Sequence, residues 1–380
     1  TAGEGLSILP LQQERQHETR REFLDWIHRF ADFPMRGKPL REHLALSDGF
    51  SAWWLSRLFT RHPEIYDSAL FEIFKLRALE RYCDEARFSE LVVHVKDVRL
   101  HAVVSAWCAA TGRTCRLMTQ KKEEALAPPS PLWKRLLKRI LPVARWRRLR
   151  GRLGIAFGWW RNERRRFPSK PVCVPGKGLA VGTWFPNLDN RAAAAGVFRS
   201  RYWEDLHPLL ETLGAPVHWL FIHIGRPEDI FTNLALRDRF RSGQGQGSMT
   251  FWEEWVSPVA FVRGLRDWLR VAAIADRMAN EVEAACVWPD SRLNIAPYIR
   301  PLWEESTQGE SLLRRILMRE GMRRWAAAIG PQAMGLTSSE LQDWERSMFQ
   351  ILRERGTPAL YAAMHSITWP EDTRFFTADE

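Results

Sequence analysis

Two short apolar segments on either side of one helix constrain the fold of this chain most strongly. Residues 89–95 (SELVVHV) and 114–120 (TCRLMTQ) have the composition of strands, and residues 98–111 predict a helix that Gly112 ends. A strand, a helix and a second strand within about thirty residues are typical of a parallel βαβ unit. Lys96 and Asp97 follow the first strand, so this unit lacks the glycine-rich dinucleotide-binding motif.

The same alternation returns in the second half of the chain. Its apolar runs are short, rich in β-branched or aromatic residues, and separated by helical patterns, as buried parallel strands require. The sequence therefore predicts an α/β fold with parallel strands. Strands are expected at 179–185, 217–224 and 358–364, and helices at 200–214, 258–286, 311–328 and 338–356, the last with a serine cap and a glycine stop.

Positive charge is concentrated in one stretch, residues 131–167. This stretch carries thirteen Lys or Arg and a single acid, Glu163, which gives +12, whereas the whole chain has a net charge of +11. Its apolar residues recur at helical spacing, so we expect an amphipathic helical insert that binds an anionic membrane surface. The expected membrane-binding residues are Arg145, Trp146, Arg147, Arg148, Trp159 and Trp160.

Two other interpretations of this stretch remain open. Basic residues interleaved with aromatic ones also suit nucleic acid, through phosphate neutralisation and base stacking. Alternatively, the segment is an ordinary amphipathic helix whose tryptophans enter the core. No recognisable nucleic-acid-binding module supports the first of these, so we do not expect nucleic acid as the partner.

Two proline-rich segments, 121–131 and 167–178, suggest boundaries on either side of the insert. We therefore expect an N-terminal α/β unit (1–125), the basic insert with its linkers (126–176) and a second α/β unit (177–380). No apolar run is long enough to span a membrane, no secretion-signal pattern is found, and five scattered cysteines indicate reduced thiols in a cytoplasmic protein. No cluster of metal-ligand residues appears, so we expect no metal and no cofactor.

Ligands of open α/β sheets bind at the carboxyl ends of the strands, which directs attention to three loops. The first follows residues 179–185 and offers Asn187, Asp189 and Arg191. The second begins at His223. Imidazole, carboxylate, amide and guanidinium groups at strand ends suit hydroxyl-rich or phosphorylated ligands. Each could instead be an ordinary polar residue at the end of an element, and Asp189 could simply cap the next helix.

The third loop contains His365 and Ser366. The preceding helix is expected to place Glu340 in its first turn with Trp344 on the same side, and Arg374 follows a short loop later. Carboxylates, a histidine and an arginine then converge without a hydrolase-type nucleophile. Such a set suits group transfer from a phosphate-activated donor, with a carboxylate base and cations at the leaving phosphate.

The segments LTSSELQDWER and LYAAMHSITWPEDTRFF resemble the C-terminal motif pair of a bacterial family of surface carbohydrate biosynthesis proteins. Members of that family are similar to GT-B glycosyltransferases, which have two Rossmann-like domains facing a cleft. GTWFPNLDN, GVFRSRYWEDL and DGFSAWWLSRLF also look like the family. The motif positions that match are Glu340, Gln342, Trp344, Glu345, Arg346, His365, Ser366, Arg374 and Phe375.

This resemblance implies two Rossmann-like units in a GT-B-like arrangement, with transfer of a sugar from a nucleotide-activated donor to a lipid-linked acceptor at the cytoplasmic membrane face. It implies Glu340 or Asp189 as the base and His365 as a further catalytic residue, with Arg374 at the donor phosphate. The expected substrate-binding residues are Asn187, Arg191, Gln342, Glu345, Ser366 and Arg374.

The sequence also departs from the family pattern. Leu341 replaces the family's asparagine, and the strands that complete a GT-B donor site would lie beyond Glu380. We therefore expect the second unit to lack its C-terminal part. A non-catalytic scaffold of polysaccharide assembly is the alternative function.

Overall fold

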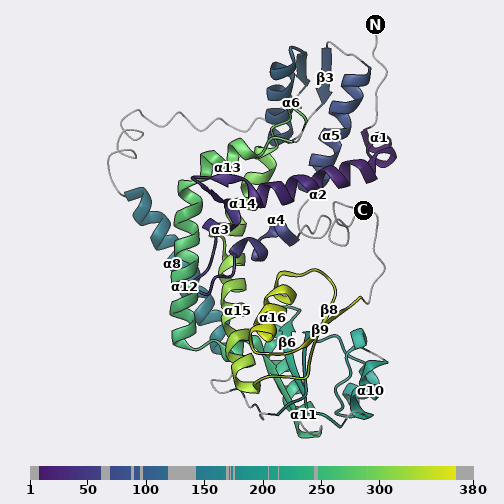
Figure 1. The fold of residues 1–380 in the computed structure, drawn as a ribbon, viewed down its shortest axis with the longest axis vertical. Coiled ribbons are helices and arrows are strands. Elements are labelled where there is room, and N and C mark those ends of the chain that lie inside the picture. Colours follow the sequence, from purple (N-terminus) through teal and green to yellow (C-terminus); the bar gives the residue numbers. More distant parts are fainter. Residues whose placement is uncertain are drawn as a thin grey trace. The chain divides into compact units, whose positions relative to one another are not determined.

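The computed structural model describes residues 8–60, 69–86, 90–94, 97–118, 143–167, 171, 173, 176–203, 205–212, 214–243, 247–288 and 290–364 (Figure 1). These residues divide into two units, each considered by itself below. Unit 1 contains the described residues up to 153 together with 271–308, and unit 2 contains 154–270 and those from 309 onward. Residues 271–308 thus belong with the N-terminal part of the chain, whereas the sequence suggested one continuous unit from residue 177.

Unit 2 is built on a five-stranded sheet whose strands are all parallel. The strand order is β7-β6-β5-β8-β9, so the chain first builds outward from β5 in one direction and then adds β8 and β9 on its other side. This 3-2-1-4-5 order is compatible with Rossmann-like folds. The elements of unit 2 are η2 (Arg164–Arg166), β5 (Leu179–Phe185), α9 (Asn190–Ala194), η3 (Arg201–Trp203), α10 (Leu206–Thr212), β6 (Val217–His223), η4 (Pro227–Asp229), α11 (Ile230–Gly243), β7 (Gly247–Phe251), η5 (Trp252–Trp255), α15 (Glu310–Ile329), β8 (Met334–Ser338), α16 (Asp343–Glu354) and β9 (Ala359–Ala363).

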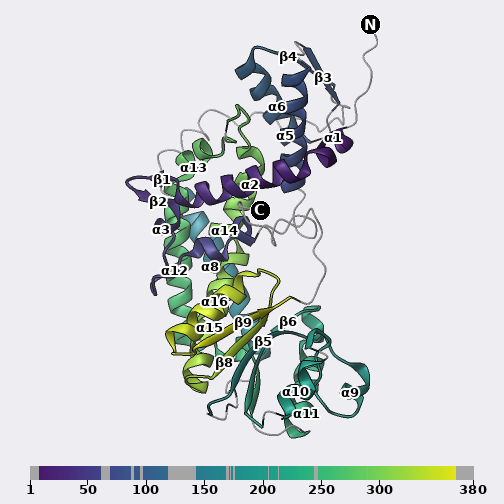
Figure 2. The same ribbon diagram turned by 45° about the vertical axis from the view of Figure 1, so that its right-hand side comes forward.

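Helices cover both faces of this sheet, as Figure 2 shows for α16 on one side and α11 on the other. Side chains alternate along a strand, so neighbouring residues of β5 face opposite layers. Phe185 packs in the core on the α11 side, with its ring centroid 4.6 Å from that of Phe221. On the other face, a Cβ added to Gly182 would lie 2.6 Å from Met348 Sδ and 2.8 Å from the Trp344 ring. The missing side chain therefore lets α16 approach the centre of the sheet.

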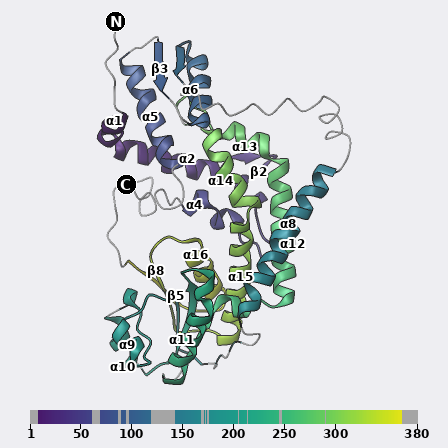
Figure 3. The ribbon, with the colours of Figure 1, turned by 180° about the vertical axis from the view of Figure 1, so that it is seen from behind.

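Two long helices, α8 (Val143–Asn162) and α12 (Pro258–Arg277), run alongside each other in Figure 3 and contain residues of both units. Within unit 2 they are joined by aromatic packing on Phe261. The ring centroids of Trp160 and Trp159 lie 4.8 and 6.2 Å from that of Phe261. None of the helices among the described residues combines the length and apolar character needed to cross a bilayer.

Unit 1 is largely helical and contains the βαβ unit expected from the sequence. The strands β3 and β4 pair in parallel, and α6 connects them. Asp97 caps the start of α6, and Gly112 ends it with a φ of 70°, a left-handed conformation that glycine adopts without strain. The elements of unit 1 are α1 (Ile8–Glu14), α2 (Gln16–Asp32), β1 (Pro34–Met35), β2 (Lys38–Pro39), α3 (Leu40–His43), η1 (Ala52–Leu55), α4 (Arg57–Thr60), α5 (Ala69–Glu85), β3 (Glu90–His94), α6 (Val98–Thr111), β4 (Thr114–Met118), α13 (Ala279–Ala285) and α14 (Ala296–Gln308).

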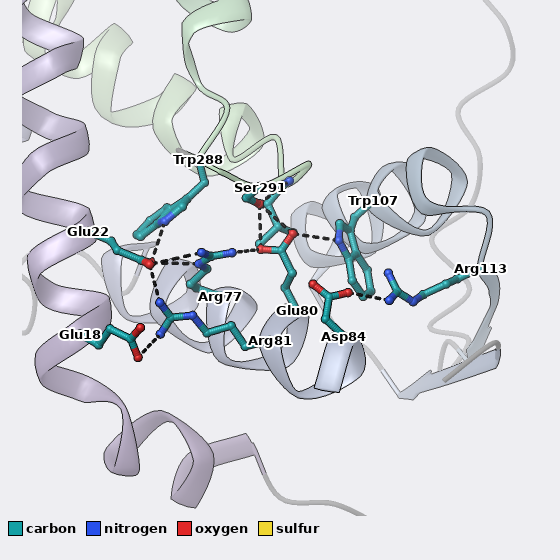
Figure 4. A network of polar contacts seen from close by, with 11 residues as sticks. Glu18, Glu22, Arg77, Glu80, Arg81, Asp84, Trp107, Arg113, Trp288 and Ser291 are labelled. Carbon is teal, nitrogen blue, oxygen red and sulfur yellow. Dashed lines mark hydrogen bonds and ion pairs between the residues drawn. The ribbon is translucent and has the colours of Figure 1, made fainter. Parts of the chain in front are cut away.

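A buried polar network ties residue 80 of α5 to α6 and to the loop between α13 and α14 (Figure 4). The Glu80 carboxylate accepts hydrogen bonds from Trp107 Nε1 at 3.1 Å and Ser291 Oγ at 2.8 Å, and forms an ion pair with Arg77 at 2.5 Å. Arg77 also pairs with Glu22 of α2 at 2.9 Å. Because the carboxylate of Glu80 is satisfied by protein groups, this network stabilises the unit and offers no obvious ligand position.

The structure confirms the α/β class and the expected parallel strands at 90–94, 179–185, 217–223 and 359–363. It also corrects three predictions. The helix expected over 200–214 is replaced by the 3-10 turn η3 and the separate helix α10, the helix expected over 258–286 is interrupted at Met278, and the helix expected from Ser338 begins only at Asp343. Strands β7 and β8 were not predicted. Ser338 is instead the last residue of β8, so it cannot serve as the expected helix cap.

Candidate functional site

The most suggestive position in unit 2 is the carboxyl edge of the sheet between β5 and β8. There the order of strand addition changes direction. Open parallel sheets bind ligands at such topological switch points. The loops at this position are residues 186–189 after β5 and 339–342 after β8.

Asp189 begins α9 and is exposed to solvent. Its Oδ1 accepts hydrogen bonds from the backbone N–H groups of Ala192 at 3.0 Å and Arg191 at 2.7 Å, which lower the pKa of the carboxyl group. It is therefore an N-cap residue, the alternative that the sequence left open. A carboxylate with a lowered pKa is also a weaker proton acceptor, which favours another residue as base. The side chain of Arg191 is exposed at the same helix start.

Asn187 is held in the loop by backbone contacts to a neighbouring segment. Its carbonyl accepts from the backbone N–H of Arg201 at 2.8 Å, and its side chain hydrogen-bonds to Tyr202. Burial raises the pKa of the Tyr202 phenol, and the nearby Glu340 carboxylate raises it further. Asn187, Tyr202 and Glu340 therefore lie near one another at the switch point.

Glu340 lies in the loop before α16, not in the first helical turn as the sequence suggested. It is half-buried, and its Oε2 accepts hydrogen bonds from the indole N–H of Trp184 at 3.3 Å and from Gln342 Nε2 at 3.5 Å. Trp184 is the second-last residue of β5, and its ring meets Trp344 edge-on at 5.6 Å between centroids. The strand thus orients a carboxylate that comes from the loop of its neighbour.

Glu345, expected to bind substrate, is buried and occupied by the protein itself. Its carboxylate accepts from Ser338 Oγ at 3.1 Å and from the backbone N–H groups of Glu340 and Gln342, at 3.1 and 3.2 Å for the shortest contacts. Together with Gln342 it forms the capping box of α16. Burial raises the pKa of Glu345 to about 8. Glu345 therefore shapes the loop that carries Glu340.

The second loop of interest is at the end of β6. His223 Nε2 accepts a hydrogen bond from Asn233 Nδ2 at 2.9 Å, because an amide nitrogen can only donate. Burial, and then the charge of Arg314, lowers the pKa of His223. Glu253 lies in η5, directly after the end of β7. Its side chain is fully buried, and burial raises its pKa to about 8. Burial therefore favours the neutral forms of His223 and Glu253.

Several expected site residues lie outside the described part of the chain. These are His365, Ser366 and Arg374. The expected convergence of His365 and Arg374 with Glu340 thus remains a prediction. Strand β9 ends at Ala363, directly before the loop that would carry His365, and it belongs to the same sheet as β5 and β8.

The structure sorts the tryptophans and arginines of the basic segment into different environments. Trp159, expected at a membrane surface, is 2% exposed and stacks on Trp252 at 5.9 Å, so this expectation is wrong. Trp160 is half-buried on Phe261, and Arg148 is exposed and pairs with Asp276 at 3.3 Å. Residues 131–142 lie outside the described residues, as do the side chains of residues 143–147 of α8, which include the expected membrane-binding residues Arg145, Trp146 and Arg147.

Arg164 shows that a cationic run is not uniformly solvated. This side chain is buried and donates to the backbone carbonyls of Val256 at 2.7 Å and Phe167 at 3.1 Å. Burial lowers its pKa. The Arg164 guanidinium therefore binds backbone carbonyl groups inside the protein. Only part of the positive charge of residues 131–167 can then lie on an external surface.

Sequence reasoning did not single out two aromatic residues of the candidate site, Trp184 and Tyr202. The sequence places Trp184 in a buried strand and predicts a helix around Tyr202, which lies in a short 3-10 turn, η3. The one feature of the sequence that could have indicated a role for these two residues is that each is an aromatic residue next to a polar loop. Comparison of the chain with protein-family models, with curated proteins and with solved structures finds no match.

Proposed function

We propose that this protein is a glycosyltransferase of the GT-B type that acts in bacterial surface polysaccharide biosynthesis. The proposed reaction transfers a sugar from a nucleotide-activated donor to a lipid-linked acceptor at the cytoplasmic face of the membrane. In this proposal unit 2 is one Rossmann-like unit, and the βαβ segment of unit 1 belongs to the second.

The observation that carries the proposal is the Glu340 carboxylate at the switch point between β5 and β8. It is half-buried, oriented by the Trp184 indole, and lies near the amide of Asn187 and the phenol of Tyr202. Amide and phenol groups hydrogen-bond sugar hydroxyls, and a positioned carboxylate can take the proton of an attacking hydroxyl. A hydroxyl-rich substrate therefore fits the chemistry of this edge.

Glu340 is the preferred base, since Asp189 caps α9 through the oxygen that two backbone N–H groups contact. Gln342 and Arg191 are proposed to contact substrate from the same two loops. His365 and Arg374, together with Ser366, are proposed at the leaving phosphate, as the family resemblance implies. No metal or cofactor is assigned a part in this reaction.

The membrane half of the proposal follows from the basic segment. A peripheral location would bring the active site to a lipid-linked acceptor without a spanning helix. The alternative, a non-catalytic scaffold in polysaccharide assembly, is favoured by one observation: Glu345, which resembles a family motif residue, is fully engaged in capping α16.

Nucleotide binding separates the two functions. The full chain is to be titrated with nucleoside diphosphates and nucleotide sugars while its melting temperature is followed. Stabilisation by one nucleotide class, saturating with concentration, supports the enzyme, because a ligand that binds only the folded state raises its stability. Absence of stabilisation by every compound of the panel contradicts the enzyme and supports the scaffold.

Transfer to lipid extracts from bacterial membranes then tests the base. Glu340→Gln is expected to reduce turnover about 10²–10⁴-fold, the usual contribution of general acid–base catalysis, while nucleotide binding is retained. Glu354→Gln serves as the matched control, because Glu354 is exposed at the far end of α16. Equal turnover in both variants would exclude Glu340 as the base.

A further inference from the structure

Helices α8 and α12 together present an apolar surface to solvent within unit 2. Three aliphatic or aromatic side chains on these helices are more than half exposed: Phe157 at 60%, Val259 at 67% and Val262 at 63%. The two helices lie side by side in Figures 1 and 3. Phe157 lies near Phe261, which directly precedes Val262 in α12, so exposed apolar side chains of the two helices come close together.

The packing around Phe261 explains why these residues face outward. Trp159 covers the ring of Phe261 and is itself buried, whereas Phe157 touches the same ring at 6.4 Å and stays exposed. Val262 follows Phe261 directly and is exposed. Val259, also exposed, lies three residues before Val262 on the same helix. Trp159 and Phe261 are thus buried between α8 and α12, whereas Phe157, Val259 and Val262 remain exposed.

Arginines surround this apolar centre. On α12 the exposed residues recur at the spacing of a single helical face, with Val259, Val262 and Arg263 followed by Arg266 and Arg270. Arg263 pairs with Glu320 at 3.2 Å, and Arg270 pairs with Asp267 at 3.2 Å. Their charges are therefore partly compensated.

Three other exposed arginines are not compensated in this way. Arg161 at the end of α8, Arg165 just beyond it and Arg266 on α12 form no ion pair with any acid among the described residues. Among the described residues, Arg161 donates to the neutral side chain of Asn162 at 3.4 Å. The surface thus combines exposed apolar side chains with uncompensated positive charge.

We propose that this α8–α12 face, defined by Phe157, Val259, Val262 and the arginines 161, 165 and 266, binds the surface of an anionic phospholipid membrane. The apolar side chains enter the boundary between head groups and acyl chains, and the arginines contact lipid phosphates. This inference rests on the membrane half of the proposed function, and it assigns insertion to Phe157 and the valines in place of Trp159.

Charge and shape favour lipid over nucleic acid as the occupant. Valine side chains have no aromatic face on which a base could stack, whereas insertion below lipid head groups requires only apolar area. The arginines supply attraction to phosphate in either case. Two of the three exposed apolar side chains, Val259 and Val262, are aliphatic. They can insert into lipid but cannot stack on bases, so they favour a membrane over nucleic acid.

The test is co-sedimentation of the full chain with vesicles of phosphatidylglycerol and phosphatidylcholine, or of phosphatidylcholine alone. Wild-type protein is expected to bind only the anionic vesicles and to detach as salt rises. Phe157→Asp and Val262→Asp should each weaken binding at least about tenfold, because insertion of a charged side chain is unfavourable. Phe231→Asp is the matched control, since Phe231 on α11 is also 63% exposed and should leave binding unchanged.

The charge contribution is measured separately. Arg161→Gln and Arg266→Gln should each reduce binding about fivefold at low salt, which corresponds to about 1 kcal/mol per basic residue near an anionic surface. Thermal unfolding of every variant verifies that the fold is intact. These positions are exposed, so melting temperatures close to that of the wild-type protein are expected.

Three results would overturn the inference. If wild-type protein binds no anionic vesicles, the membrane half of the proposed function fails with it, whereas nucleotide binding tests the catalytic half independently. If wild-type protein binds but the Phe157 and Val262 variants bind equally well, the membrane site lies elsewhere. Tighter binding to a single-stranded oligonucleotide than to anionic vesicles at physiological salt would assign the face to nucleic acid.

Discussion

Replacing Glu345 by glutamine tests whether this carboxyl group serves the loop before α16 or is kept for a ligand. The side chain is 4% exposed, and its two oxygens accept from Ser338 and from two backbone N–H groups. Glutamine has the same shape, but its amide nitrogen cannot accept. At least one buried donor would lose its partner, which costs about 1–3 kcal/mol.

The pH dependence of this cost provides a second magnitude. Burial raises the pKa of Glu345 to about 8 from an ordinary value of 4.5. Between these values the folded state binds more protons than the unfolded state, so the free energy of unfolding falls as pH rises. The slope approaches about 1.4 kcal/mol per pH unit, and the loss between pH 5 and 7 is about 2.5 kcal/mol. Glutamine does not titrate and lacks this loss.

Urea unfolding of the wild-type protein and of Glu345→Gln at pH 5, 6 and 7 measures both effects. The variant should be less stable at pH 5, and the difference should shrink by about 2.5 kcal/mol by pH 7. Taking the difference between the two proteins removes the contributions of other titrating groups. Stability curves that remain parallel over this range would show that the carboxyl group is ionised throughout, and would refute the argument from burial. Unchanged stability at all pH values would refute the capping role.

Three further substitutions test the remaining polar groups. Arg237→Met should lower the free energy of unfolding by about 3–5 kcal/mol, because it leaves the buried Glu254 carboxylate without its 2.7 Å ion pair. Adding Glu254→Gln should recover part of this loss. If urea unfolding gives the same loss for the single and the double variant, the two side chains are not coupled. Asp189→Asn keeps an N-cap acceptor and should preserve both melting temperature and transfer, whereas loss of transfer at unchanged melting temperature would make Asp189 the base. Glu80→Ala should lower the melting temperature by several degrees, since it leaves Arg77 without one of its buried partners; an unchanged value would show that the network is dispensable.

Five strands of the fold, β3, β4, β5, β6 and β9, could be predicted from sequence because they are short, mainly apolar segments separated by helical patterns. The strands β7 (GSMTF) and β8 (MGLTS) could not, because small polar residues fill buried positions there. Thr250 accepts from Trp255 Nε1 at 3.0 Å, and Ser248 contacts His218 Nδ1 at 3.1 Å. Hydrogen bonds of this kind remove the cost of burying a hydroxyl, but they are invisible in a hydropathy pattern.

The candidate site was predictable only in outline. The end of β5 directed attention to the loop that carries Asn187, but Glu340 was expected in a helix and lies in the loop after β8, a strand that the sequence did not predict. Glu345 follows Gln342 at the spacing of a capping box, a pattern that competes with the serine cap suggested at Ser338. The strand β8 extends to Ser338 and decides between the two. Similarly, helical periodicity identified α8 but could not show that Trp159 faces the protein while the side chain of Phe157 faces water.

The interrupted course of the chain has a consequence for biosynthesis. Between β7 and β8 the polypeptide contributes residues 271–308 to unit 1 before it returns to the sheet of unit 2. At a translation rate of roughly 5–20 residues per second, the segment from 252 to 333 takes roughly 4–16 s to synthesise. During that time β5 is an unpaired sheet edge, a site prone to mispairing with other chains. Expression of fragments that stop before residue 334 should therefore produce aggregation, and chaperones that shield strand edges should matter most while this part of the chain is being made.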